Sequence, residues 1–199
     1  MVEVLAFNRW STAGITVGDA GLEKYITTQA RIVPKTGARY AGAKFHKSKI
    51  FIVERLINKV MGPGHKGRKH WRSSGHMSGK AQQAHNIVEK ALIIVEEKTR
   101  ENPIKVLVDA IVNAAPREQI VTIEYGGARY PKATECAPQR RVDLSLRLFA
   151  QGAYAKSFNT KRKIQDCLAE EIVMAYKMDA KSSAIQKKLD VERSADAAR

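Results

Sequence analysis

The chain has 199 residues, 44% of them hydrophobic, which is enough for one domain of ordinary size with a buried core. Its formal net charge is +15, which usually indicates a polyanionic partner, with nucleic acid as the first candidate and an acidic membrane surface as the second. The apolar runs are too short to span a bilayer, and the first residues lack an apolar run of signal-peptide length. Two cysteines are too few for a disulfide-stapled secreted domain. We therefore expect a cytoplasmic protein.

The first half of the chain changes from an irregular to a helical pattern. Residues 1–43 have no sustained hydrophobic period and are interrupted by glycines and a proline, which predicts an irregular N-terminal extension before a helical domain over 44–199. From residue 50, apolar residues recur every three or four positions, which predicts a helix that ends at the Gly-Pro-Gly of 62–64. Residues 65–80 are basic, glycine-rich and without a period, which is typical of a long exposed loop.

Two further helices are predicted before the pattern changes. The first covers about 80–98, and the second begins at Pro103, where Asn102 supplies the N-cap. Residues 119–135 then alternate, turn at a Gly-Gly pair and alternate again, which is typical of a two-stranded hairpin. Pro131 fits an edge position on the return strand, because proline cannot donate a hydrogen bond to a neighbouring strand.

Helical spacing returns after Pro138 and predicts three more helices. The last of them begins at SAIQ, residues 183–186, which has the spacing of a capping box. We therefore expect a mainly α protein, a bundle of about six helices with a two-stranded β-ribbon arm between the third and fourth helices.

Basic residues are concentrated between residues 44 and 80, where ten lysines and arginines accompany a single acid, Glu54. A charge run is often only a solvated surface, but one sign of charge, many glycines and the ring of Trp71 favour phosphate contacts with a stacking partner. Arg140 and Arg141 stand where a helix should begin, and cations there oppose the helix dipole. This suggests an external anion, with ordinary surface charge as the alternative.

Other chemistries find little support in the sequence. His65, His70 and His76 lack the paired cysteines or the HExxH spacing of zinc sites, so we predict no metal. The segment GHMSGKA at 75–81 has three residues between its glycines and an Ala after the Lys, so it departs from a phosphate-binding P-loop. No nucleophile, base and acid are grouped in a recognisable motif. We therefore predict no catalytic site and no cofactor.

Five separated motifs resemble one family in order and spacing. They are VERLINKVMGPG at 53–64, ENPIKVLVDAIVNAAPRE at 101–118, GGARYP at 126–131, APQRRVDLSLRLFAQGA at 137–153 and CLAEEIVMA at 167–175. In this order they resemble the universal small-subunit ribosomal protein S-seven, whose eukaryotic member is named S-five. The resemblance covers roughly residues 40–199, and the N-terminal segment looks like the archaeal or eukaryotic branch.

The resemblance implies a helical bundle with a β-ribbon arm that binds the 3′ major domain of small-subunit ribosomal RNA (rRNA) and nucleates assembly of the subunit head. It also implies that the arm lies near the exit-site tRNA and the mRNA path, and that neighbouring head proteins are partners. The arm, and three arginines after it, match family positions, whereas contacts of the longer loop over 62–79 are inferred from charge alone. The candidate rRNA-binding residues are Lys44, Lys47, Lys49, Lys66, Arg68, Lys69, Trp71, Arg72, Lys80, Arg117, Arg129, Tyr130, Lys132, Arg140, Arg141 and Arg147.

One alternative of a different class stays open at this stage. Architectural DNA-binding proteins also carry β-ribbon arms on a helical body. They are usually shorter chains that dimerise and place an apolar or proline wedge at the tip of the arm, whereas the tip here is Gly126-Gly127. Competition between duplex DNA and structured rRNA would separate the two.

Overall fold

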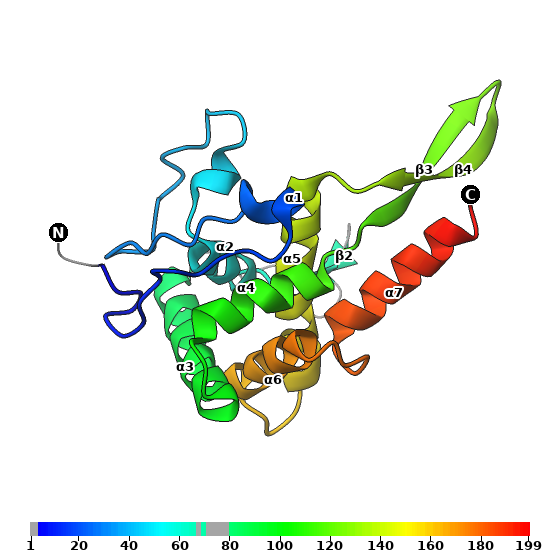
Figure 1. Ribbon diagram of the computed structural model, residues 1–199. Coiled ribbons are helices and arrows are strands. Elements are labelled where there is room, and N and C mark those ends of the chain that lie inside the picture. The colour runs from blue at the N-terminus through cyan, green and yellow to red at the C-terminus, as the bar shows by residue number, and fades with distance from the viewer. Residues whose placement is uncertain (1–3, 67–68, 71–79) are drawn as a thin grey trace.

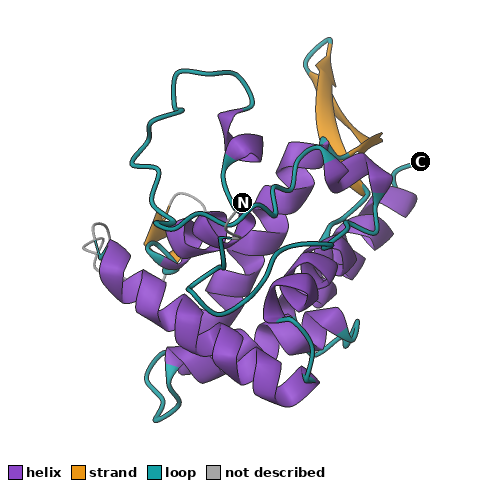
Figure 2. Cartoon of the chain, turned by 60° about the vertical axis from the view of Figure 1, so that its left-hand side comes forward, coloured by secondary structure: helices purple, strands orange, loops and turns teal. Residues whose placement is uncertain are grey.

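A computed structural model describes residues 4–66, 69–70 and 80–199 (Figure 1). Over these residues the chain forms a helical body from which one β-hairpin projects as an arm (Figures 1 and 2). The elements are α1 (Ala20–Glu23), the 3-10 helix η1 (His46–Lys49), α2 (Ile52–Val60), β1 (His65–Lys66), β2 (Lys69–His70), α3 (Ala81–Thr99), α4 (Pro103–Ala114), β3 (Glu118–Tyr125), β4 (Ala128–Glu135), α5 (Pro138–Ser157), α6 (Ile164–Tyr176) and α7 (Ser183–Asp196).

The predicted fold class is confirmed. The six predicted helices correspond to α2 through α7, and the arm lies between α4 and α5, the third and fourth of them. The structure adds α1, a helix of one turn whose four residues are too few to show a hydrophobic period. It also adds the short antiparallel pair of β1 and β2, so the basic segment after α2 is not wholly irregular.

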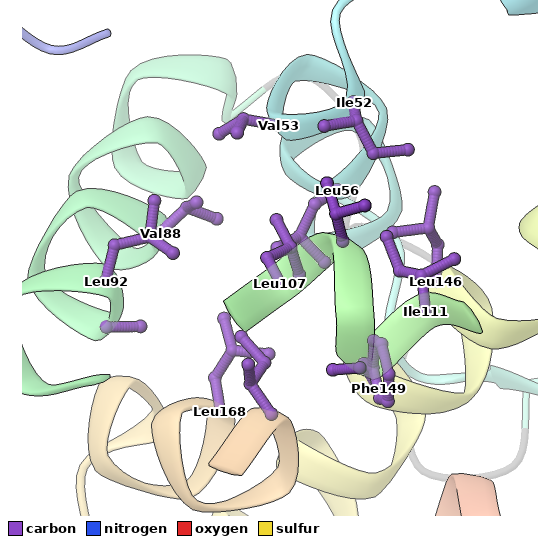
Figure 3. Close-up of a cluster of buried hydrophobic side chains, with 14 of the residues drawn as sticks. Ile52, Val53, Leu56, Val88, Leu92, Leu107, Ile111, Leu146, Phe149 and Leu168 are labelled. Atoms are coloured by element: carbon purple, nitrogen blue, oxygen red, sulfur yellow. The ribbon is translucent and has the colours of Figure 1, made fainter. Parts of the chain in front are cut away.

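The core is organised around α4, which is apolar on nearly all sides. Asn102 caps this helix, since its side chain accepts a hydrogen bond from the backbone N–H of Ile104 at 3.0 Å. Leu107 and Ile111 of α4 are fully buried between α2, α3, α5 and α6 (Figure 3). Lys105, Asp109 and Asn113, spaced four residues apart, form a narrow polar stripe, and the rest of the helix surface is mostly buried by its neighbours, which explains its largely apolar sequence.

The N-terminal segment packs against this body (Figure 1). Trp10 and Leu22 belong to the buried core, and the indole N–H of Trp10 donates to Glu96 on α3 at 3.0 Å. A single parallel bridge joins Thr27 to Phe51 directly before α2. Contacts between residues this far apart in sequence leave no local period, which is why this part of the sequence gave no pattern.

A buried carboxylate joins the three helices α5, α6 and α7. Glu171 of α6 is fully buried, and Lys156 of α5 lies 2.7 Å from its Oε1. Its Oε2 accepts hydrogen bonds from the Ser182 hydroxyl at 2.9 Å and from the Ser183 N–H at 3.1 Å. Ser182, the N-cap residue of α7, makes no side-chain cap of its own, so Glu171 takes that role from a neighbouring helix.

The described helices include none that is long and apolar enough to cross a membrane. Cys167 is fully buried on α6, as its position on an apolar helix face predicted. Cys136 is also buried, directly after the arm, and both thiols are free. Burial raises the pKa of each thiol above its usual value, which disfavours the reactive thiolate.

Candidate nucleic-acid interface

The arm is a regular antiparallel hairpin that extends beyond the helices (Figure 1). Its register runs from Glu118 opposite Glu135 to Tyr125 opposite Ala128. The two turn glycines, Gly126 and Gly127, have φ angles of 57° and 81°, which only glycine adopts without strain, so the predicted tight turn is confirmed. An isolated hairpin is marginal in water, and here only the base of the arm packs on α7.

The two faces of the arm differ in chemistry. Because directly paired residues share a face, Ile123 and Tyr130 lie on the same side as Val121 and Lys132, together with Tyr125 near the tip. This aromatic face is exposed, with Tyr125 81% and Tyr130 59% accessible. Exposed rings can stack on bases and an exposed cation can contact phosphate, so this face has the chemistry of a candidate RNA-binding surface.

Arg129 lies on the opposite face of the arm from Tyr130 and Lys132. Its Nε is 3.6 Å from the Glu124 carboxylate in the paired strand, and both side chains are largely exposed. A pair this exposed contributes little to stability and exchanges readily for another anion. The three arm residues predicted as rRNA contacts are therefore divided between the two faces.

Cations surround the base of the arm. Arg117 and Arg140 are exposed there, and Arg140 Nε donates to Gln119 Oε1 of β3 at 2.8 Å. Arg147 is exposed two turns further along α5. Arg140 and Arg147 line a cleft of about 770 Å³ between α5, α7 and the arm, to which Lys187 of α7 adds a further cation.

Arg141 differs from its neighbour because its anion is internal. Its side chain is only 11% exposed, its Nη2 lies 2.9 Å from Asp19 Oδ2, and its Nε donates to the Pro116 carbonyl at 3.1 Å. Asp19 also caps α1 by accepting from the N–H of Gly21 at 2.8 Å. Burial would raise the pKa of Asp19, but the hydrogen bonds and the charge of Arg141 hold it below its usual value. The helix start that lacked an anion in the sequence thus has one from the N-terminal segment.

The loop before α2, residues 31–51, places Lys44, Lys47 and Lys49 on the surface. Lys47 Nζ lies 2.9 Å from Asp143 Oδ2 on α5, and Arg55 Nη2 lies 3.2 Å from Oδ1 of the same carboxylate. Arg55 is only 4% exposed and also donates to the Tyr25 carbonyl at 2.8 Å. Asp143 therefore joins the loop, α2 and α5 through two cations.

Replacing Asp143 by Asn should destabilise the chain by about 2 kcal/mol at pH 7, because it leaves the buried Arg55 guanidinium without its counter-ion. Burial alone would raise the pKa of Asp143, but the hydrogen bond from Lys47 and the nearby cations lower it below its usual value. A lowered folded-state pKa stabilises the fold above the unfolded pKa, and this stabilisation is lost as the pH falls through the folded value. Urea denaturation should therefore show that the difference in the free energy of unfolding between variant and parent shrinks below about pH 4. The exposed Asp196→Asn is the control, and a difference that stays constant down to pH 2 would refute this role.

Several predicted residues lie at the limit of the described chain or outside it. Lys66 and Lys69 are paired across β1 and β2. Lys80 is exposed at the start of α3. Arg68, Trp71 and Arg72 lie outside the described residues, so their assignment stays a prediction.

Sequence reasoning missed three basic residues that the structure brings beside the candidate contacts, namely Arg55, Lys59 and Lys187. Arg55 and Lys59 belong to the basic run between residues 44 and 80 but were not among the predicted contacts, whereas Lys187 lies far outside that run. The described residues contain no group of three potential metal ligands.

Comparisons with known proteins agree with the resemblance read from the motifs. The chain is 47% identical over 193 residues to a protein named small ribosomal subunit protein uS7 from Nanoarchaeum equitans. The aligned region covers 97% of this chain and 98% of the relative. The chain is 46% identical to the proteins of the same name from Archaeoglobus fulgidus, over 99% of this chain and 96% of the relative, and from Methanothrix thermoacetophila, over 97% and 98%. The model of the family described as ribosomal protein S7p/S5e matches residues 22–199. With a match of this extent and these identities, the chain belongs to the ribosomal protein S7p/S5e family.

Proposed function

We propose that the chain binds the 3′ major domain of small-subunit rRNA, nucleates assembly of the subunit head, and brings its arm near the exit-site tRNA and the mRNA path. As a member of its family it is a structural constituent of the small ribosomal subunit in the cytoplasm. Its partners are rRNA and neighbouring ribosomal proteins, and its role is structural. The finer assignments rest on the distribution of its charges.

The observation that carries the proposal is a set of exposed cations that the protein itself leaves unneutralised. None of them forms an ion pair with any residue of the described chain, in contrast to Arg141, Arg162 and Arg199, which are paired internally. The set is Lys44, Lys49, Lys80, Arg117, Lys132 and Arg147.

These cations come from separate elements: the loop before α2, the start of α3, the residue before β3, the middle of β4, and α5. A rigid body that presents cations from several elements contacts several RNA helices at once and reduces the phosphate repulsion between them. The exposed aromatic face of the arm supplies rings for unpaired bases, which duplex DNA does not offer. This arrangement favours folded RNA over the architectural DNA-binding alternative.

The proposal is tested by filter binding of the full chain to a 3′ major domain rRNA fragment at several salt concentrations. Six phosphate contacts predict a slope of log affinity against log salt of roughly −4 or steeper. Duplex DNA at an equal concentration of phosphate should fail to displace the protein, and co-sedimentation with the small subunit should survive high salt. Displacement by duplex DNA would instead support the architectural alternative.

A further inference from the structure

A second, smaller cleft lies where the loop before α2 passes over α2 and α5. Its volume is about 270 Å³, and its basic lining residues are His46 and Lys47 of η1 with Arg55 and Lys59 of α2. Asp143 of α5 is its one acidic lining residue. Three permanent cations therefore face a single carboxylate.

That carboxylate is already engaged by two of the three cations. One oxygen of Asp143 contacts Lys47 and the other contacts Arg55. Lys59 is half-buried beside them and forms no ion pair within the described chain. Arg55 Nε is also buried without a hydrogen-bond partner there. The cleft thus holds a surplus of positive charge, and of its three cations Lys59 alone has no ion pair within the described chain.

The cleft is built in the free protein, because its outer wall is fixed to the helices. The buried Glu54 of α2 accepts hydrogen bonds from both the N–H and the hydroxyl of Thr36, each at 2.7 Å. Across the loop, Arg31 donates to the Tyr40 hydroxyl at 3.2 Å and stacks 5.6 Å from the centre of its ring. Thr36 and Tyr40 both line the cleft, so contacts within the protein hold this part of its wall in place without a ligand.

The electrostatics of Lys59 favour an anion. Burial lowers the pKa of its ammonium group, attraction to Asp143 opposes this, and repulsion from Lys47, Arg147 and Arg55 lowers it further. A partly desolvated cation among other cations is destabilised, and a bound counter-ion relieves this cost. Exposed cations on the same loop, including Lys44 and Lys49, attract a polyanion towards the opening.

We propose that this cleft is a binding site for a backbone phosphate of the rRNA, received by Lys59 with Arg55 and Lys47. This rests on the proposed function, since the phosphate is taken to be part of the rRNA. Asp143 acts as a positioning residue, which holds Arg55 and Lys47 in place before the phosphate arrives. The site belongs to the body of the protein and is independent of the arm.

The test is lysine footprinting of the full chain by reductive methylation and mass spectrometry, free and bound to the 3′ major domain fragment. A bound phosphate covers the Lys59 amine and raises its pKa, and each unit of that rise slows labelling about tenfold at neutral pH. Lys59 should be strongly protected, whereas the exposed Lys98 of α3 should not. If Lys44 and Lys132 are protected in the complex but Lys59 is not, the phosphate site in the cleft is refuted and the proposed function stands. If the rRNA fragment protects no lysine of the chain, the proposed function itself is refuted.

Two further experiments identify the source of the phosphate and the contribution of Lys59. Protection of Lys59 by rRNA, with or without protection by inorganic phosphate, supports the proposal, whereas protection by inorganic phosphate and not by rRNA overturns it. Lys59→Met should reduce the salt slope of rRNA binding by roughly one contact, 0.7 to 0.9, and Lys98→Met should leave it unchanged. An unchanged slope for Lys59→Met, in a variant with the circular dichroism of the parent, would also refute the site.

Discussion

Replacing Lys44, Lys49, Lys80 and Arg147 together by Gln should lower the affinity for the 3′ major domain fragment about a hundredfold or more at 0.1 M salt. These four side chains are exposed and form no ion pair with any described residue, so their charge is free for phosphate. The slope of log affinity against log salt should fall by roughly 3, because each lost contact removes 0.7 to 0.9. Filter binding over roughly 0.05–0.3 M salt measures both the affinity and the slope.

A matched variant separates local contacts from total charge. Lys90, Lys98, Lys177 and Lys181 are also exposed and without ion pairs among the described residues, but they lie on α3 and around the turn from α6 to α7. Replacing these four by Gln removes the same net charge and should change the slope much less. Equal losses for both variants would show that only the overall charge matters, which would contradict the assignment of the interface.

Replacing Glu171 by Ala should cost about 3 kcal/mol of the free energy of unfolding. The change removes the acceptor for the Ser182 hydroxyl and the Ser183 N–H, which begin α7, and the partner of Lys156 on α5. The melting temperature should fall by roughly 6–12 °C, given about 2–4 °C per kcal/mol for a chain of this size. Because α7 packs against the base of the arm, the loss should also loosen the arm, which hydrogen exchange would detect.

The adjacent Glu170 is the control for this change. It pairs with Arg162, whose side chain is 52% exposed, so Glu170→Ala should cost less than about 1 kcal/mol. Glu171→Gln should fall between the two, because its amide oxygen still accepts from the serines although the charge opposite Lys156 is lost. Similar costs for Glu170→Ala and Glu171→Ala in urea denaturation would refute the capping role of Glu171.

The charges of the candidate interface are visible in the sequence, although its contacts with RNA stay a prediction. Lys44, Lys47 and Lys49 are exposed, and the arm has the turn that its two glycines predict, whereas most of residues 65–80, predicted as an exposed loop, lies outside the described residues. What the sequence did not reveal is which cations are already neutralised. Arg140 and Arg141 are identical neighbours in sequence, yet one is exposed and the other is paired with Asp19, 122 residues earlier.

The sequence by itself determined the helices, the arm and the surplus of positive charge, because these depend on local spacing, turn glycines and composition. Only the tertiary structure decided which charges are used internally: Glu171 at the start of α7, Asp143 between Lys47 and Arg55, and Lys59 without an ion pair within the described chain. The physical reason is that a helix period reports which face is buried, whereas an ion pair or a cleft needs side chains that packing alone brings within a few ångströms. The one-turn α1 shows the same limit, since its N-cap Asp19 is fixed by Arg141 as well as by its own turn.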